Sequence, residues 1–296
     1  MNRRTFLFQS TALAAGAMLF PTACASDSKS KSSSKIAPGL QVYTIREALA
    51  EDFKGSMKRV ADLGYKNIEL FAYRNEQYFG YTIPETNALM SDLGLQVKSS
   101  HVSTGWTSPD VVGTMTNKWE QTVQDAAELG QDYIVLAYLT EAERETMDDY
   151  KKVAELLNSC GETAKNAGLQ MAYHNHDFEF ETVDDQVPYD FLLSECDENL
   201  VKFEMDLYWT LRAGKDPIRY FENHPGRFPL WHVKDMAADE EKFFAAVGEG
   251  VIDWKNMFAH AETAGLDYYF VEQDATKSGK PFEEIEKSIT YLKDML

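Results

Sequence analysis

The chain has 296 residues, of which 44% are hydrophobic and 26% are charged, and its formal net charge at pH 7 is -19. Such acidity argues against nucleic acid or another bulky polyanion as a partner, because negative charges repel. Three cysteines are too few for a disulfide framework in a chain of this size.

Residues 1–35 are expected to be an export signal and tether. A twin arginine, Arg3-Arg4, precedes an apolar, alanine-rich stretch, and residues 26–35 are rich in Ser and Lys. Cys24 resembles the acylated cysteine of a bacterial lipoprotein. We therefore expect an exported protein, either periplasmic or lipid-anchored in the cell envelope, with no other membrane contact. A buried N-terminal helix is the alternative.

Residues 36–296 are expected to fold as one domain, because no Pro/Gly/Ser-rich linker interrupts them. Short β-branched or aromatic runs alternate with longer stretches of helical period. The expected strands are 39–43, 67–71, 96–101, 133–138, 170–176, 201–206, 230–233 and 268–272. The expected helices are 53–63, 84–93, 118–129, 148–167, 189–195, 217–223, 254–264 and 282–296.

Eight repeated βα units of this size predict an α/β fold, a single (β/α)8 TIM barrel. Four helical stretches stop at a glycine followed by an apolar residue, at Gly64, Gly94, Gly168 and Gly265. Glycine supplies the left-handed conformation that ends a helix. A doubly wound open sheet is the alternative, but no Gly-rich phosphate turn follows the first strand.

Polar residues gather at the carboxyl ends of the expected strands, where a TIM barrel places its active site. They are His101, His174, His176, Asp206, His232 and Glu272. This convergence predicts a metal-dependent enzyme.

Each strand end also permits a simpler interpretation. His174 and His176 are two residues apart, so both face the barrel interior if the strand continues through them, as ligands or as hydrogen-bonded structural residues. Asp206 ends an apolar strand and is either a metal ligand or a helix N-cap. His232 and Lys234 share a face, and Glu272 either binds metal or forms a buried ion pair with Lys234.

Taken together, His174, Asp206, His232 and Glu272 lie on four consecutive strands. Their mixed nitrogen and oxygen atoms suit one divalent ion, Mn²⁺, Co²⁺, Zn²⁺ or Fe²⁺. The alternative is four unrelated structural roles.

From about residue 36 onward the chain resembles the sugar phosphate isomerase/epimerase family of xylose-isomerase-like TIM barrels. The resemblance rests on 64–70 (GYKNIEL), 172–176 (AYHNH), 205–209 (MDLYW), 232–235 (HVKD) and 271–272 (VE). It implies one divalent metal held by a Glu, an Asp, a His and a Glu. Asp206, His232 and Glu272 match the last three, whereas His174 replaces the first Glu.

The resemblance predicts a metal-dependent isomerase or epimerase that removes a proton next to the carbonyl of a keto-sugar through an enediolate. The alternatives are a 3-keto-glycoside lyase or keto-sugar dehydratase with the same site, and a non-catalytic glycan-binding lipoprotein. The predicted catalytic residues are Glu272, His174 and Lys234. The predicted substrate-binding residues are His101, His176, Glu69, Trp209 and Trp106. A small carbohydrate is the expected partner, and the sequence leaves oligomerisation open.

Overall fold

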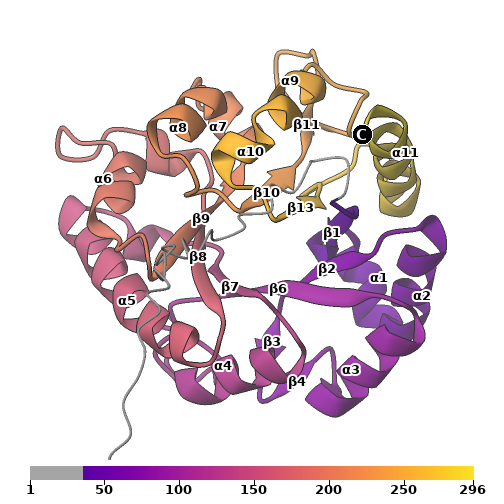
Figure 1. Cartoon of the computed structure of the whole chain (residues 1–296), viewed down its shortest axis with the longest axis horizontal. Coiled ribbons are helices and arrows are strands. Elements are labelled where there is room, and N and C mark those ends of the chain that lie inside the picture. Colours follow the sequence, from indigo (N-terminus) through magenta and orange to yellow (C-terminus); the bar gives the residue numbers. More distant parts are fainter. Residues whose placement is uncertain (1–35) are drawn as a thin grey trace, which may run out of the picture. The chain divides into compact units, whose positions relative to one another are not determined.

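The computed structural model describes residues 36–296, so the predicted export signal, the tether and Cys24 lie outside the described residues. Eight parallel strands close into a barrel in the order β1-β13-β10-β9-β8-β7-β6-β2 (Figure 1). These strands are β1 (Gly39–Gln41), β2 (Asn67–Leu70), β6 (Gln96–Val102), β7 (Tyr133–Leu136), β8 (Gln170–His174), β9 (Val201–Asp206), β10 (Leu230–Val233) and β13 (Tyr268–Val271). The predicted TIM barrel is confirmed.

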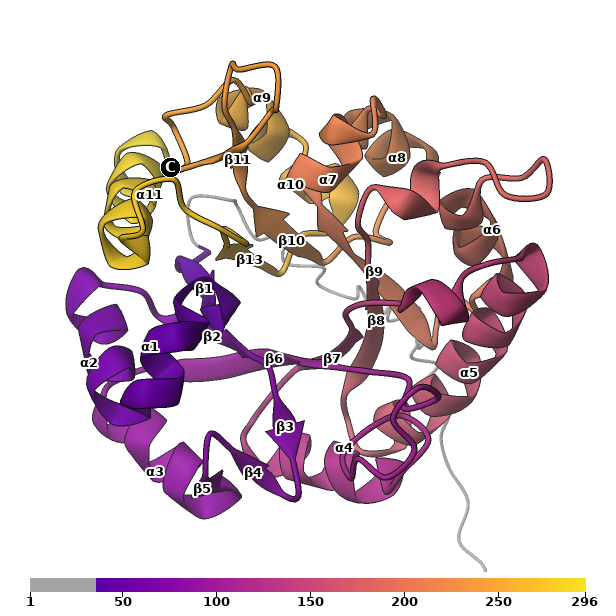
Figure 2. The same ribbon diagram turned by 180° about the vertical axis from the view of Figure 1, so that it is seen from behind.

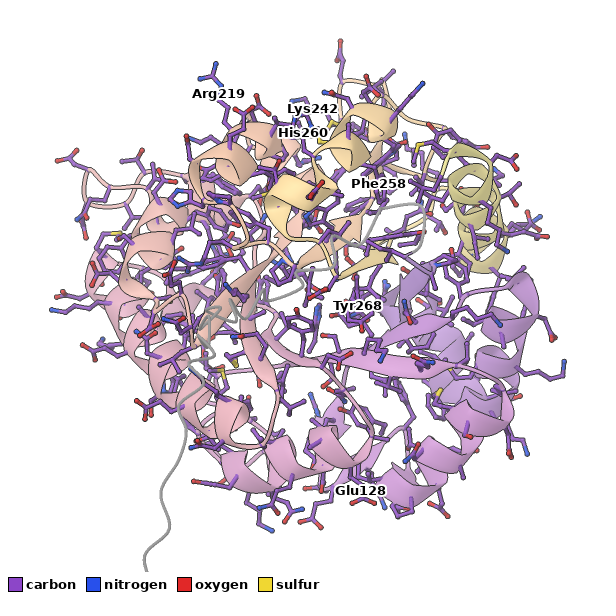
Figure 3. All side chains as sticks on the ribbon, in the orientation of Figure 1. Glu128, Arg219, Lys242, Phe258, His260 and Tyr268 are labelled. Atoms are coloured by element: carbon purple, nitrogen blue, oxygen red, sulfur yellow. The ribbon has the colours of Figure 1, made fainter. Side chains whose placement is uncertain are left out.

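Helices surround the barrel as an outer ring, and side chains such as Glu128 and Arg219 lie at its periphery (Figure 3). The helices are α2 (Phe53–Leu63), α3 (Ile83–Asp92), α4 (Trp119–Glu128), α5 (Met147–Asn166), α6 (Pro188–Glu195), α8 (Pro217–Asn223), α9 (Trp254–Ala259), α10 (Ala261–Ala264) and α11 (Pro281–Met295). The helix expected over 254–264 is divided at His260. Within residues 36–296, no helix is long and apolar enough to cross a membrane.

Several short elements were not predicted, because two to six residues show no clear period. A small antiparallel sheet lies next to α3 (Figure 2). The additional elements are α1 (Arg46–Glu51), α7 (Leu207–Arg212), β3 (Tyr73–Arg74), β4 (Gln77–Tyr78), β5 (Tyr81–Thr82), β11 (Asp235–Met236) and β12 (Phe244–Ala245). The 3-10 turns are η2 (Val42–Ile45), η3 (Glu141–Glu143) and η4 (Phe178–Phe180).

The barrel interior is closed by a small apolar plug, which comprises Tyr133, Val135, Ala172, Leu230 and Phe270. A much larger apolar core lies between the strands and the helices. Successive residues of a strand face opposite sides, so every second residue points into the barrel. In a strand that contributes to the plug, the next inward residue therefore lies above the plug, nearer the carboxyl end of the barrel. The layer above the plug is polar, and it forms the floor of the site.

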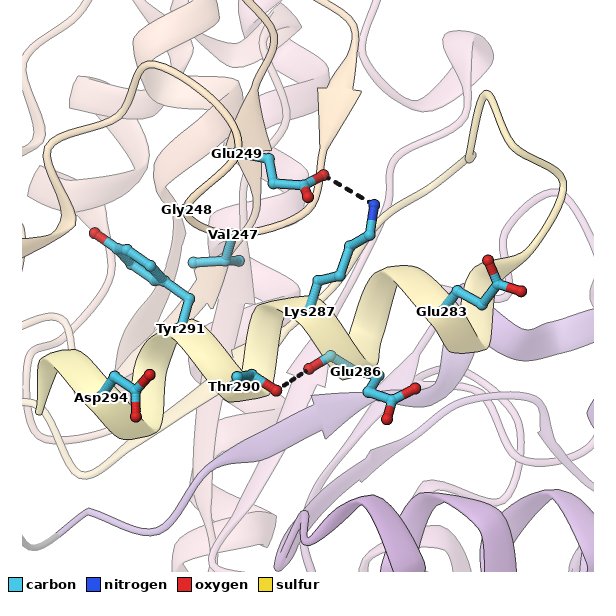
Figure 4. Close-up of a pocket in the computed structure, with 9 residues that line it drawn as sticks. All are labelled: Val247, Gly248, Glu249, Glu283, Glu286, Lys287, Thr290, Tyr291 and Asp294. Atoms are coloured by element: carbon cyan, nitrogen blue, oxygen red, sulfur yellow. Dashed lines mark hydrogen bonds and ion pairs between the residues drawn. The ribbon is translucent and has the colours of Figure 1, made fainter.

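The last helix packs against the loop around Gly248, between β12 and α9 (Figure 4). The φ of Gly248 is 90°, and a Cβ at this position would collide with the ring of Tyr291. We expect Gly248→Ala to lower the free energy of unfolding by roughly 1–3 kcal/mol, measured by urea denaturation. Gly168→Ala is the matched control, because Gly168 also has a positive φ but nothing within 4 Å of its added Cβ. Equal losses in the two variants would contradict the predicted collision.

Candidate active site

A cavity of about 820 Å³ opens at the carboxyl ends of the strands. Five predicted site residues line it, namely His101, His174, His176, Trp209 and Glu272. They come from β6, from β8 and the loop after it, from α7, and from the end of β13. The barrel topology thus brings together side chains that are up to 171 residues apart in the sequence, the separation from His101 to Glu272.

A buried lysine lies among three carboxylates beside this cavity. We call Asp206, Lys234, Glu272 and Asp274 the rim cluster. The Lys234 Nζ atom is 2.7 Å from Glu272 Oε2, 3.0 Å from Asp206 Oδ2 and 3.0 Å from Asp274 Oδ2. Burial favours the neutral amine, but the three carboxylates raise the pKa of Lys234 well above its ordinary value. Lys234 is therefore an ammonium ion in the protein interior.

Deeper in the barrel, three imidazoles contact two carboxylates. We call Glu69, His101, His174, Glu204 and His232 the inner cluster. Glu204 Oε2 is 3.0 Å from His101 Nε2, 3.0 Å from His174 Nδ1 and 3.2 Å from His232 Nε2. Glu69 Oε2 is 3.0 Å from His101 Nε2 and 2.6 Å from His232 Nε2. Both carboxylates are fully buried.

His232 of the inner cluster also contacts the rim cluster, because its two ring nitrogens face different carboxylates. Its Nδ1 atom is 2.9 Å from Glu272 Oε2, whereas its Nε2 atom faces Glu69 and Glu204. The potential metal-binding atoms accordingly fall into two groups, His101, His174, Glu204 and His232 in one and Asp206, His232 and Glu272 in the other. The two groups adjoin, because Asp206 Oδ2 is 3.9 Å from His174 Nε2 and 3.8 Å from His232 Nδ1. The four predicted ligands are therefore neighbours of one another across the two groups.

The donor atoms of the inner cluster fit a divalent transition metal. Imidazole nitrogen and carboxylate oxygen are the atoms that Zn²⁺, Co²⁺ and Fe²⁺ accept. Glu69 Oε1 and Glu204 Oε1 are buried and have no hydrogen-bond partner among the described residues. Buried polar atoms normally have partners, so these two oxygens are consistent with a cation ligand.

Burial and neighbouring charges shift the pKa values of the three imidazoles of the inner cluster in different directions. Burial opposes charge on His101, but Glu69 and Glu204 raise its pKa to about 9. Burial also opposes charge on His232, yet Glu204, Glu272 and Glu69 raise its pKa well above the usual range. Burial lowers the pKa of His174, and the neighbouring cations lower it further. Burial and the neighbouring Glu69 raise the pKa of Glu204 to about 7, so its charge also changes near neutral pH.

Asp206 combines the two roles considered from the sequence. Its Oδ1 atom accepts a 2.9 Å hydrogen bond from the backbone N–H of Trp209 and so caps α7. Its Oδ2 atom makes the ion pair with Lys234. Burial raises the pKa of Asp206, although Lys234 and His232 oppose this shift. The predicted alternative for Glu272, a buried ion pair with Lys234, is also present.

His176 lies beyond the end of β8, because that strand stops at His174. Its ring is surrounded by aromatic rings, with centroid distances of 5.1 Å to Tyr138, 5.5 Å to Phe178 and 5.6 Å to Trp209. Burial and the charge of Lys234 lower its pKa to about 3. His176 is thus a neutral imidazole on the cavity wall.

Two residues predicted to bind substrate lie elsewhere. Glu69 does not line the cavity, because it is buried in the inner cluster, where it also accepts a 2.8 Å hydrogen bond from Gln41 Nε2. Trp106 is 37% exposed and does not line the cavity, although Gly105 and Thr107 on either side of it do.

The sequence reasoning missed Glu204 and Asp274. Each lies two residues from a predicted site residue, Glu204 before Asp206 and Asp274 after Glu272. The same period-two rule that paired His232 with Lys234 would have found them. Glu204 was overlooked because it lies inside an apolar strand rather than at its end.

Known proteins share this fold. Residues 57–295 match the family profile described as xylose isomerase-like TIM barrel. The crystal structure of a sugar phosphate isomerase/epimerase from Parabacteroides distasonis is 30% identical, with a TM-score of 0.73, and the match covers 93% of this chain and 98% of that one. The IolI protein with a bound zinc atom shares the fold at 14% identity and a TM-score of 0.70, covering 88% of this chain and 98% of that one.

An inosose dehydratase of Lacticaseibacillus casei is 30% identical over 166 residues. The match covers 50% of this chain and 55% of that protein, so it spans about half the length of such curated relatives. The family profile, in contrast, extends over most of the chain. The resemblance seen in the sequence is confirmed, and the chain belongs to the xylose isomerase-like TIM barrel family.

Proposed function

We propose that this protein is a sugar-converting enzyme that removes the proton next to the carbonyl of a keto-sugar and expels an oxygen substituent from the adjacent carbon. It would therefore be a lyase or dehydratase. The observation that carries this proposal is the uneven distribution of acid–base groups around the cavity. Carboxylates follow β13, where Lys234 lies among them, and imidazoles lie at or just beyond the ends of β6 and β8. They are Glu272 and Asp274 on one side and His101, His174 and His176 on the other.

Asp274 is the better base of the two carboxylates. Glu272 Oε2 is held by both Lys234 and His232, which keep the pKa of Glu272 below its usual range despite burial. The side chain of Asp274 is 27% exposed, and burial raises its pKa to about 6 although Lys234 opposes the shift. A base with a pKa near the working pH transfers protons efficiently.

The proposed step conserves protons and electrons. The C–H bond next to the carbonyl breaks, its proton passes to Asp274, and its electron pair forms an enolate. The positive charge of the buried Lys234, which lies 3.0 Å from Asp274 Oδ2, would stabilise that enolate electrostatically from behind the cavity wall. When the enolate collapses to the unsaturated ketone, the bond to the oxygen substituent on the next carbon breaks. The departing oxygen takes a proton from water, while the neutral His176 can donate a hydrogen bond to it. A divalent metal bound nearby would add Lewis acidity.

A ketose epimerase is the second candidate, and the name of the Parabacteroides relative favours it. Epimerisation needs acid–base groups on both faces of the enediolate. Across the cavity, the Glu143 carboxylate accepts hydrogen bonds from Thr104 Oγ1 and from the Thr140 backbone N–H and hydroxyl. Because that carboxylate is already satisfied, elimination is the better-supported reaction. A glycan-binding protein has no need of the buried rim cluster, so the non-catalytic alternative is weaker still.

The substrate is proposed to be an unphosphorylated keto-sugar or keto-glycoside. Glu143, Glu272 and Asp274 line the cavity, and Arg74 is the only arginine or lysine among its lining residues. A phosphate group would meet mainly like charge. The export expected from residues 1–35 agrees with a substrate outside the cytoplasm. Trp209 and Phe244 on the cavity wall offer surfaces for sugar carbons.

Proton NMR in D₂O tests the proposal with the full chain, glucosides and their 3-keto derivatives. We expect release of the aglycone from the keto derivative, with formation of an unsaturated ketone. Deuterium exchange with inversion and without release would establish the epimerase instead. No exchange and no release with any sugar, in metal-supplemented buffer, would overturn both reactions.

A further inference from the structure

We infer that the cavity binds a glycoside in two parts, and that the exposed ring of Tyr138 is the platform for its aglycone, the group that leaves with the departing oxygen. The aglycone would be uncharged and would carry a ring of its own, aromatic or sugar. This inference rests on the proposed function and adds a substrate class to it, a keto-glycoside with a ring-bearing aglycone in place of a free keto-sugar.

The exposed aromatic side chains of residues 36–296 are concentrated at the cavity. Three large aromatic residues are exposed in this part of the chain, Tyr138 at 46%, Tyr43 at 38% and Trp106 at 37%. Tyr138 and Tyr43 line the cavity, and Trp106 lies between Gly105 and Thr107, which both line it. Exposed aromatic surface is unfavourable in water, so its concentration at a concave site indicates ligand binding.

The acid–base groups occupy only part of the cavity wall. The carboxylates follow β13, and the imidazoles of His174 and His176 lie at and beyond the end of β8. The segments after β1, β2, β6 and β7, four neighbouring strands of the barrel, supply mainly apolar and hydroxyl groups. Arg74 and Glu143 are the only charged residues that these segments contribute to the lining. This half of the cavity suits a part of the substrate that carries no charge and does not react.

The size of the cavity also favours a substrate with more than one ring. Sites for drug-sized ligands measure roughly 300–1,000 Å³. The cavity volume of about 820 Å³ lies toward the upper end of that range. A free hexose is smaller than a drug-sized molecule and would leave much of this volume to water. A glycoside with a ring-bearing aglycone would fill both halves.

The position of His176 assigns the two parts of the substrate to the two halves. Its ring centroid is 5.6 Å from that of Trp209 and 5.1 Å from that of Tyr138. His176 follows β8, which lies between β9, followed by Trp209, and β7, followed by Tyr138. In the proposed reaction the sugar packs on Trp209 and the departing oxygen meets His176. The next atom beyond that oxygen belongs to the aglycone, so the aglycone lies toward Tyr138.

The ring of Tyr138 is suited to stacking. It contacts His176 at an interplanar angle of 83° and Phe178 at 89°, so neither ring lies parallel against it. Nearly half of Tyr138 is exposed, at the cavity. Aromatic rings gain free energy when a second ring packs on them in an offset-stacked arrangement. A ring-bearing aglycone would provide that second ring.

The two other exposed rings lie on segments that are held in place. The Arg46 guanidinium lies 4.4 Å from the Tyr43 ring centroid, and its Nη1 atom donates a 3.1 Å hydrogen bond to the Tyr43 carbonyl. The Trp106 backbone N–H donates a 3.1 Å hydrogen bond to Thr104 Oγ1, which itself donates to Glu143. Groups that are already ordered lose little entropy when a ligand binds. Tyr43 and Trp106 would therefore complete the aglycone half around Tyr138.

Two substrates with similar leaving alcohols test the inference. Benzyl and methyl 3-keto-glucosides expel alcohols of similar acidity, so a difference in kcat/KM reports aglycone binding. We expect the wild-type full chain to prefer the benzyl compound about tenfold, the contribution of one ring stack. Tyr138→Ala should lower the benzyl/methyl ratio of kcat/KM about tenfold, whereas Tyr138→Phe should keep it. A wild-type ratio near one, or the wild-type ratio in Tyr138→Ala, would overturn the inference.

A binding measurement separates failure of this inference from failure of the proposed function. Benzyl glucoside without the keto group cannot eliminate, so its binding needs no turnover. In saturation-transfer NMR with the full chain, we expect transfer to its phenyl protons, and weaker transfer in Tyr138→Ala. This result with no conversion of either keto compound would support the aglycone platform and overturn the reaction. No transfer to the phenyl protons, or equal transfer in Tyr138→Ala, would overturn the platform whatever the activity.

Discussion

Replacing Lys234 by methionine is expected to lower the free energy of unfolding by roughly 3–5 kcal/mol, because it removes a fully buried ammonium from among three carboxylates, of which Asp206 and Glu272 are buried. Asp206, Glu272 and Asp274 would each lose a contact of 3.0 Å or less. The loss should be largest near neutral pH and should shrink in acid, where the carboxylates take up protons. Urea denaturation at several pH values measures both effects.

Lys277→Met is the matched control for this prediction. Lys277 also contacts a carboxylate, Asp239 at 2.6 Å, but 57% of its side chain is exposed. An exposed ion pair contributes about 0–1 kcal/mol, so this variant should remain close to wild type. Similar losses for the two lysines would show that the rim cluster does not depend on a buried charge.

Replacing Asp274 by asparagine is expected to reduce kcat/KM for the elimination by about 10²–10⁴-fold, because an amide cannot accept the substrate proton. Binding should change much less, since asparagine keeps the shape and one acceptor oxygen. Kinetics on a keto-glycoside that the wild-type chain converts would separate kcat from KM. A rise in KM at constant kcat would show that Asp274 binds the substrate and does not act as the base.

The wild-type pH profile follows from the same assignment. A base works when it is deprotonated, and burial raises the pKa of Asp274 to about 6. Activity should therefore rise with pH through about 6 and fall off below it. Asp132→Asn is the control, because Asp132 precedes β7 at the opposite end of the barrel. This substitution should leave the rise of activity with pH unchanged. A wild-type profile that is flat between pH 5 and pH 7, an interval around that pKa, would rule out Asp274 as the titrating base.

The fold could be predicted because local signals repeat along the chain. The strands over Val201–Asp206 and Leu230–Val233 and the helices over Phe53–Leu63 and Pro217–Asn223 have the expected bounds. In each, one hydrophobic period and a boundary signal fix the element without help from distant residues. Helix α7 was missed because its six residues follow directly from a strand and begin at the Asp206 cap.

The identity of most site residues was also readable, because inward-facing polar residues at strand ends stand out from an apolar pattern. The contacts that each of these residues makes could not be predicted from the sequence. The sequence could not say that Lys234 lies within 3.0 Å of three carboxylates, or that His174 faces Glu204 with one ring nitrogen and Asp206 with the other.

The chain by itself therefore determined a βα barrel and the residues at its catalytic end, since hydrophobic period and strand-end chemistry are local properties. Only the tertiary structure decided how those residues divide between the rim and inner clusters. The division depends on the height of each side chain within the closed barrel, which is set by the register between strands such as His232 beside Asp206 and Phe270. Register arises from pairing between distant segments, and for that reason no single segment encodes it.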